Sequence, residues 1–229
     1  FLMTSEEIRL TLKSQMDILE LKDDLIFDLE TDLVSGSLGE IDEGCDDEQN
    51  YNGVHWAHGA SKVVLLDVEP STVYKIPFTK TLSCVWNNDI DGYDEVLDKY
   101  ETDYCNLEAK IYEAAEELGL EKAFAKTEFF GQVNGLPIYS SERADSYSTY
   151  NSEISKEEYE ELEELAKNEF DCSYMAIEDW INFLFYYGYE FCIKLDEFFE
   201  NYSINDIRDS NMGTINGYPV LIDYSGFDS

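Results

Sequence analysis

The chain has 229 residues, of which 44% are hydrophobic and 14% aromatic, and its formal net charge is −36 at pH 7. This length and apolar content suffice for a folded core, so the composition excludes a disordered acidic tail. The charge repels polyanions, which excludes broad electrostatic binding to nucleic acid or to anionic membranes. The charge is compatible with a basic protein partner, with a cell interior of high salt concentration, or with a protein that electrostatic repulsion simply keeps soluble.

No apolar run approaches the ~18 residues that a membrane-spanning helix needs, and no signal peptide is evident. The five cysteines include no Cys-x-x-Cys pair, which favours free thiols in a reducing compartment. We therefore expect a cytoplasmic protein that does not bind a membrane.

The first segment, residues 1–52, predicts a helical and acidic N-terminal extension. Thr4 and Glu7 have the spacing of a capping box, which opens a helix. The apolar residues on one face of this helix are Ile8, Leu12, Met16 and Leu19. Residues 35–52, first rich in glycine and serine and then in acids, predict a loop.

Two strands joined by a turn are predicted for residues 63–68 and 72–76. Lys75 ends the second strand, and the alternation of side chains puts Val73 on the same face. A single lysine in a strand can equally be a solvent-facing charge. The preceding loop, Gly59-Ala60-Ser61-Lys62, could place backbone N–H groups around phosphates.

An acidic insertion follows at residues 84–103. Six of its positions have the spacing of a calcium-binding EF-hand loop: Asn87, Asp89, Asp91, Gly92, Glu95 and Asp98. The last ligand position is aspartate in place of glutamate, and the flanking sequence is not convincingly helical. Calcium binding is therefore a minor hypothesis for this insertion.

A helix is predicted after the insertion, because apolar residues recur there at spacings of three and four. They are Tyr104, Leu107, Ile111, Ala115 and Leu118. Glu108 flanks this apolar face and could point inward, although helix glutamates are usually solvated and three others lie nearby. Beyond the helix, residues 129–139 predict a second hairpin around Asn134-Gly135.

Two further helices are predicted in the C-terminal part. Ser155 and Glu158 form a second capping box. Residues 176–202 predict one long helix whose aromatic side chains lie nearly all round it, which is typical of a buried central helix.

The last segment combines polar residues with a tight hairpin. Asn216-Gly217 favours a two-residue turn, because both positions tolerate positive φ. If Ile215 pairs with the residue after this turn, Asn211 lies opposite the residue before Asp223. Asp206, five residues upstream of Asn211, could act as a base. Hard oxygen ligands beside a base suit Mg²⁺ and phosphoryl transfer, although a surface hairpin with ordinary turn carboxylates would share this pattern.

These motifs resemble those of the protein-kinase-like superfamily, in its minimal or divergent, phage and bacterial forms. In that family an aspartate, then an asparagine five residues on, precede a hairpin that ends in Asp-Phe-Gly. Here the corresponding end reads Asp223-Tyr-Ser-Gly. The resemblance implies that Asp206 orients or deprotonates the acceptor hydroxyl and that Arg208 meets the γ-phosphate. It also implies that Asn211 and Asp223 hold Mg²⁺.

The resemblance assigns roles to the first half of the chain as well. Lys75 would reach the α- and β-phosphates of ATP, and Val73 would cover the adenine. Glu108 would pair with Lys75. Backbone groups from Glu142 to Ala144 would meet the adenine edge at the hinge between two lobes. The loop Gly59-Ala60-Ser61-Lys62 would cover the phosphates.

The sequence also departs from the family pattern. The phosphate loop has one glycine where protein kinases have three, and Ile204 stands where the family usually has histidine, two residues before Asp206. Six residues follow Asp223, which leaves no room for an activation segment. We therefore expect a truncated helical C-lobe.

The resulting prediction is an α+β, two-lobed, protein-kinase-like fold. Residues 1–52 form the extension, residues 53–144 a small antiparallel-sheet N-lobe with the hinge, and residues 145–229 the C-lobe. The leading function is an ATP- and Mg²⁺-dependent phosphotransferase, whose acceptor the sequence does not specify. The alternative is a non-catalytic, kinase-like acidic binding protein, such as a phage-type inhibitor or DNA mimic that captures a basic partner.

Overall fold

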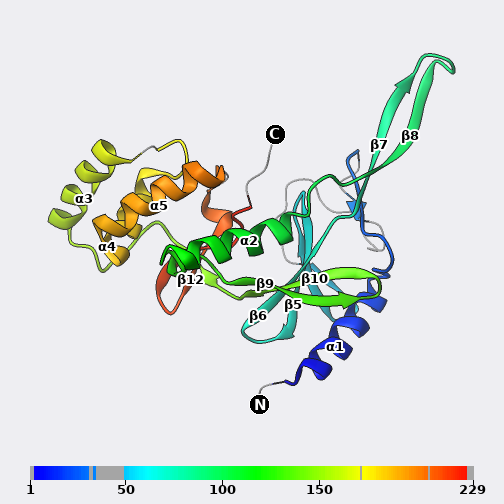
Figure 1. The fold of residues 1–229 in the computed structure, drawn as a ribbon, viewed down its shortest axis with the longest axis horizontal. Coiled ribbons are helices and arrows are strands. Elements are labelled where there is room, and N and C mark those ends of the chain that lie inside the picture. The colour runs from blue at the N-terminus through cyan, green and yellow to red at the C-terminus, as the bar shows by residue number, and fades with distance from the viewer. Residues whose placement is uncertain (1–2, 31–32, 35–48, 171, 206, 226–229) are drawn as a thin grey trace. The chain divides into compact units, whose positions relative to one another are not determined.

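The computed structural model describes residues 3–30, 33–34, 49–170, 172–205 and 207–225 (Figure 1). Over these residues the chain forms five α-helices and three β-sheets, which confirms the predicted α+β class. Contacts divide the chain into two compact units. The first unit comprises residues 1–106 and 127–142, and the second comprises residues 107–126 and 143–229.

A six-stranded antiparallel sheet forms the centre of the first unit, with the strand order β3-β4-β5-β6-β10-β9. Its strands are β3 (Gln49–Tyr51), β4 (Val54–His58), β5 (Lys62–Glu69), β6 (Thr72–Pro77), β9 (Thr127–Val133) and β10 (Leu136–Glu142). The strands predicted at residues 63–68 and 72–76 are confirmed. The hairpin around Asn134-Gly135 is also confirmed, and both turn residues have positive φ, 51° and 80°.

Helix α1 (Ser5–Ile18) packs against this sheet and confirms the predicted N-terminal helix. The Glu7 backbone N–H donates to the Thr4 hydroxyl, and the Thr4 backbone N–H donates to the Glu7 carboxylate at 2.7 Å. The side chains of Leu12 and Met16 are fully buried in the core of the first unit. The Arg9 guanidinium also donates to the carbonyl of Gln132 in β9 at 2.8 Å.

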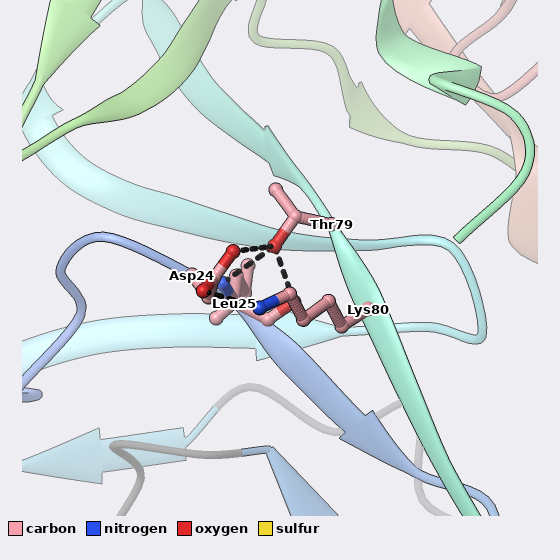
Figure 2. A network of polar contacts seen from close by, with 4 residues as sticks. All are labelled: Asp24, Leu25, Thr79 and Lys80. Carbon is pink, nitrogen blue, oxygen red and sulfur yellow. Dashed lines mark hydrogen bonds and ion pairs between the residues drawn. The ribbon is translucent and has the colours of Figure 1, made fainter. Parts of the chain in front are cut away.

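A second sheet of the first unit has the strand order β2-β1-β7-β8. Its strands are β1 (Ile26–Asp28), β2 (Leu33–Val34), β7 (Lys80–Asn87) and β8 (Gly92–Lys99). Strand β1 runs parallel to the start of β7. Figure 2 shows the contacts at this junction, where Lys80 Nζ lies 2.7 Å from Asp24 Oδ2 and the Leu25 N–H donates to the Thr79 hydroxyl.

The EF-hand interpretation of the acidic insertion is wrong. Residues 80–99 form one long antiparallel hairpin, so two strands flank the polar turn and no helix does. The dipeptide Asp91-Gly92 is a hairpin signal in the sequence, and Asp91 takes a positive φ of 51°.

The second unit is mainly helical. Its helices are the greater part of α2 (Tyr104–Glu117), then α3 (Lys156–Glu169), α4 (Ile177–Tyr187) and α5 (Tyr189–Tyr202). A three-stranded antiparallel sheet has the order β11-β12-β13, from β11 (Asp145–Ser146), β12 (Met212–Ile215) and β13 (Tyr218–Leu221). Short 3₁₀ helices lie at Glu121–Ala123 and Asp209–Asn211. The helix at residues 104–118 and the capping box of Ser155 are confirmed.

The prediction of one long helix over residues 176–202 is wrong. Gly188, with φ 80° and ψ 165°, separates α4 from α5, because this conformation cannot continue a helix. The aromatic side chains are nevertheless buried as expected. Trp180 and Phe199 are fully buried, and Trp180 stacks on Phe170 with ring centroids 4.3 Å apart. No helix in the described parts of the chain has both the length and the apolar composition of a membrane span.

Candidate functional site

The hairpin of β12 and β13 has the predicted register. Ile215 pairs with Tyr218 across a turn in which Asn216 and Gly217 have φ of 54° and 83°, as a type I′ turn requires. At the open end, the Ile222 N–H donates to the Asn211 carbonyl at 2.9 Å. Asn211 therefore lies opposite Ile222, next to Asp223, as the sequence predicts.

Residues on both sides of Asp223 are firmly anchored. Before it, the carbonyl of Leu221 accepts the Ala125 N–H at 2.8 Å. After it, Tyr224 is 1% exposed, and its hydroxyl donates to the Ala125 carbonyl at 2.8 Å. Asp223 itself is partly exposed, and its Oδ1 accepts the Ser225 hydroxyl at 3.5 Å. The backbone on both sides of Asp223 is thus fixed by hydrogen bonds and burial.

Asn211 and Asp223 together have donor chemistry that fits Mg²⁺. An amide oxygen and a carboxylate are hard ligands, and Mg²⁺ in phosphoryl-transfer enzymes is commonly bound by one or two carboxylates together with waters and substrate phosphates. Within the described parts of the chain, no group of three or more His, Cys, Asp or Glu side chains is arranged to hold a metal ion. Asn211 and Asp223 therefore suit a metal ion whose other ligands include phosphate oxygens, and they do not suit a site in which protein atoms supply every ligand.

The segment before Asn211 carries the other predicted residues of this hairpin end. Asp206, the predicted base, lies outside the described residues. Its neighbours Ile204 and Ile207 are 1% and 9% exposed, and Arg208 is exposed. The Arg208 carbonyl accepts the Asn211 N–H at 2.8 Å. Buried isoleucines thus anchor the chain on both sides of position 206, and one of them, Ile204, occupies the place of the expected histidine.

Lys75 lies on β6, between β5 and β10 of the six-stranded sheet, where it pairs with Val64 and Tyr139. Its side chain is only 5% exposed, so the alternative of a solvent-facing lysine is wrong. Val73 lies two residues earlier on the same strand and is partly buried. Burial of an ammonium group is costly unless other groups compensate its charge.

Glu108 lies on α2, in the part of that helix that belongs to the second unit. Its side chain is fully buried, whereas the neighbouring glutamates Glu101, Glu113 and Glu116 are exposed. The structure therefore distinguishes Glu108 from the others, and the alternative of a solvated helix glutamate is wrong for this residue.

The predicted phosphate loop is a tight turn between β4 and β5. The Gly59 N–H donates to the Lys62 carbonyl at 3.1 Å, and the Tyr100 hydroxyl donates to the Ala60 carbonyl at 2.6 Å. Ser61 and Lys62 are buried, with 8% and 3% exposure. Burial raises the pKa of Tyr100 to about 12, so this hydroxyl remains protonated and able to donate at neutral pH.

The predicted hinge residues lie at the boundary of the two units. Glu142 ends β10 and is exposed, and the boundary falls between Glu142 and Arg143. Just before it, the hydroxyls of Ser141 and Thr127 share a buried hydrogen bond of 3.0 Å. Ala144, two residues after Glu142, is partly buried in the second unit.

Charged side chains are rarely buried in this acidic chain. Among the described residues, the buried charged side chains are those of Lys62, Lys75, Glu108 and Asp179. The Asp179 carboxylate accepts the Tyr147 hydroxyl at 2.6 Å, which offsets part of the cost of its burial. The other three are all residues that the sequence assigns to the candidate site.

Within each unit, the structure brings together only part of the predicted set. Lys75, Val73 and the turn at Gly59 share the six-stranded sheet of the first unit, and Asn211 and Asp223 share the hairpin end of the second. Tyr100 was not predicted from the sequence, because it contacts the turn at Ala60 from a position remote in the chain. Comparisons with protein-family models, curated proteins and solved structures found no match for this chain.

Proposed function

We propose that this chain is an ATP- and Mg²⁺-dependent phosphotransferase of the protein-kinase-like type. The observation that carries the proposal is the burial of Lys62, Lys75 and Glu108, which together with Asp179 are the buried charged side chains among the described residues. Removing charged groups from water is unfavourable unless other groups compensate the charge, so their burial calls for a specific role. One of the three points at which the chain passes between the units lies directly after Glu142, at the predicted hinge.

In this proposal each unit contributes its own set of groups. Lys75, balanced by Glu108, contacts the α- and β-phosphates, and the turn at Gly59 lies over the phosphates. Asn211 and Asp223 would hold Mg²⁺, and the chemistry that the ion would supply is neutralisation of negative charge on the phosphates. Local cations and the metal are required because the net charge of −36 repels free nucleotide.

The reaction is transfer of the γ-phosphoryl group to an acceptor hydroxyl. The acceptor oxygen forms a bond to the γ-phosphorus while the bond to the bridging oxygen of ADP breaks. Asp206 orients the hydroxyl or accepts its proton, and Arg208 offsets the charge of the transferred group. The acceptor is a protein side chain, a small molecule or the chain itself.

Nucleotide binding is the first test, because it needs no acceptor. The thermal midpoint of the full chain is measured with ATP, with Mg²⁺, and with both. At a nucleotide concentration of 100 Kd, binding stabilises the folded state by about 2.7 kcal/mol, so the midpoint should rise with MgATP and not with either component alone. Lys75→Met and Asp223→Asn should abolish this rise, whereas Asp91→Asn, at the exposed β7–β8 turn, should retain it.

Phosphoryl transfer is the second test. Incorporation of radiolabelled γ-phosphate is followed in the wild-type chain, in Asp206→Asn and in Asp223→Ala. Both variants should lose at least about 100-fold in rate, as removal of a catalytic base or a metal ligand typically does. Activity that survives both substitutions would contradict the site assignment.

A non-catalytic acidic binding protein is the second candidate function. It is favoured by the phosphate turn with its single glycine and by an exposed acidic hairpin in the first unit. The absence of any midpoint rise with MgATP, together with tight binding of a basic protein, would favour this function over phosphotransfer.

A further inference from the structure

The hairpin of β7 and β8 extends beyond the sheet to which it belongs. Strand β1 pairs with β7 only from Lys80 to Leu82, whereas β7 and β8 remain paired up to Asn87 and Gly92. Figure 1 shows this hairpin reaching past the other strands of the first unit. We call residues 81–98 the arm. In the described structure its outer part is a two-stranded ribbon without a third strand.

Large apolar side chains of the arm are exposed to solvent. Their exposed fractions are 51% for Val85, 48% for Trp86, 59% for Ile90, 69% for Tyr93 and 49% for Leu97. Cross-strand pairing puts Trp86 beside Tyr93 and Leu82 beside Leu97 on one face of the ribbon. The Trp86 and Tyr93 rings pack edge to face with centroids 5.1 Å apart. This face therefore presents an apolar ladder of two pairs, between which Cys84 pairs with Glu95.

Exposed large apolar side chains also occur elsewhere in this protein, but among its tryptophans Trp86 is the exposed one. The chain has three tryptophans, and the other two, Trp56 and Trp180, are 3% and 0% exposed. An isolated two-stranded ribbon is only marginally stable in water, and contiguous exposed apolar surface commonly marks a site of interaction. The arm therefore has the surface of a docking element.

The charge of the arm indicates what it binds. Residues 81–98 contain five acidic side chains and no lysine, arginine or histidine. The acids are Asp89, Asp91, Asp94, Glu95 and Asp98. Desolvation, and then the carboxylates of Glu30, Glu95 and Asp28, raise the pKa of the Cys84 thiol. The base of the arm therefore lies in a negative electrostatic field.

A hollow beside the turn, mainly on the face of the ribbon opposite the apolar ladder, is lined by apolar and acidic side chains. Its volume is about 370 Å³, and its lining includes Val85, Trp86, Asp89 and Asp94. Asp94 accepts a hydrogen bond from the Asn87 amide, which orients its carboxylate. A lysine or arginine side chain matches this lining, because its stem is apolar and its head is cationic.

We propose that the arm is a docking site for a basic segment of a partner protein in which lysine or arginine alternates with apolar residues. A second copy of this chain does not fit, because it would oppose the same five carboxylates to one another. Nucleic acid is excluded by the same charge. The proposal does not depend on phosphotransfer, and it applies to either candidate function.

The exposure of Trp86 provides a direct test with the full chain and no nucleotide. The probe is a synthetic peptide in which arginine alternates with leucine. Two further peptides serve as controls, one with serine in place of leucine and one with glutamate in place of arginine. The arginine–leucine peptide should reduce acrylamide quenching of tryptophan fluorescence by about twofold or more, because it covers the one half-exposed indole. The glutamate peptide should leave quenching unchanged.

Matched variants separate docking on the arm from diffuse attraction to an acidic protein. The arm variant combines Asp94→Asn, Glu95→Gln and Asp98→Asn. The control variant removes the same charge from the exposed face of α3, by Glu157→Gln, Glu161→Gln and Glu164→Gln. Peptide affinity, measured by calorimetry, should fall about tenfold or more in the arm variant and less than about twofold in the control.

A third variant, Tyr93→Ser with Leu97→Ser, tests the apolar ladder. It should reduce the affinity of the arginine–leucine peptide to that of the arginine–serine peptide and retain the thermal midpoint of the wild-type chain. Equal loss of affinity in the arm and α3 charge variants would overturn the proposal, since only net charge would then matter. Unchanged quenching of Trp86 at saturating peptide would also overturn it.

Discussion

Two hairpins of this molecule have similar turn residues, but the apolar side chains of one are buried and those of the other are exposed to solvent. The β12–β13 hairpin closes through Asn216-Gly217 and buries its apolar residues, with Val220 3% and Leu221 0% exposed. The β7–β8 hairpin closes through a longer turn that ends in Asp91-Gly92, and it leaves Trp86 and Leu97 half exposed. Turn chemistry therefore fixes strand pairing in both hairpins, whereas the neighbouring elements decide whether the apolar face becomes core or surface.

The difference bears on function. The buried hairpin fixes the backbone on both sides of Asp223, and the proposed function needs this rigidity, because there Asp223 is proposed as a metal ligand. The exposed hairpin has no comparable packing beyond Leu82 in the described structure. Its apolar side chains are thus available to a partner.

Identical leucine truncations should give the largest contrast between the two hairpins. Leu221→Ala removes a fully buried side chain and should lower the free energy of unfolding of the second unit by about 2–5 kcal/mol. Leu97→Ala removes a half-exposed side chain and should change stability by less than about 0.5 kcal/mol. Urea unfolding, with hydrogen exchange to assign each transition to a unit, measures both. Similar losses in the two variants would mean that the arm is packed and not free.

Two glycines of the buried hairpin should respond differently to alanine. At Gly213 a Cβ atom would lie 2.4 Å from the Ala144 Cβ and 3.1 Å from the Asp145 carbonyl oxygen, so Gly213→Ala should cost about 2–3 kcal/mol through steric overlap. At Gly217 a Cβ atom meets nothing within 4 Å, and the cost of about 1 kcal/mol comes from the positive φ of 83° alone. The same unfolding experiment measures both, and a larger loss for Gly217→Ala would contradict this ranking.

The smallest effect is expected at the junction that connects the arm to the N-terminal segment. A hydrogen bond from Lys80 lowers the pKa of Asp24, so this pair contributes stability above the unfolded pKa of about 3.9 and loses it as the pH falls through the lower, folded value. Asp24→Asn should therefore lower the thermal midpoint slightly at neutral pH, and the difference from wild type should shrink below about pH 4. Both partners are partly exposed, which keeps the effect small.

Asp89→Asn, at the exposed turn of the arm, is the control for this pH series. A difference between Asp24→Asn and wild type that grows on acidification would reverse the sign expected from the lowered pKa.

Local sequence patterns predicted much of the fold. The capping boxes at Thr4 and Ser155 and the hairpins at Asn134-Gly135 and Asn216-Gly217 were all predicted, because each depends on residues within a few positions of one another. The end of one helix and the start of the next at Gly188 were not predicted, because the aromatic residues on both sides have no clear helical period that would show the interruption. The parallel pairing of residues 26–28 with residues 80–82 was missed as well, because it joins distant segments that carry no mutual signal.

The candidate site likewise has features that local sequence predicts and features that depend on long-range packing. The register that places Asn211 beside Asp223 follows from the turn and could be read from the sequence. The inward position of Glu108 was expected because this residue flanks the apolar face of its helix. The burial of Lys75 could not be read, because a single lysine in a strand can equally face solvent. Burial depends on which face of a strand or helix the rest of the fold covers, and that is set by long-range packing.

The division of the chain into units has a consequence for synthesis on the ribosome. The chain passes from one unit to the other after Asn106, after Lys126 and again after Glu142. The first unit can fold once residue 142 has left the ribosome. At that point the side chains of Ile111 and Phe124, in residues 107–126, still lack their packing partners, because those residues are translated later. In a nascent chain of intermediate length, the apolar side chains of this segment therefore lack the partners that cover them in the folded second unit.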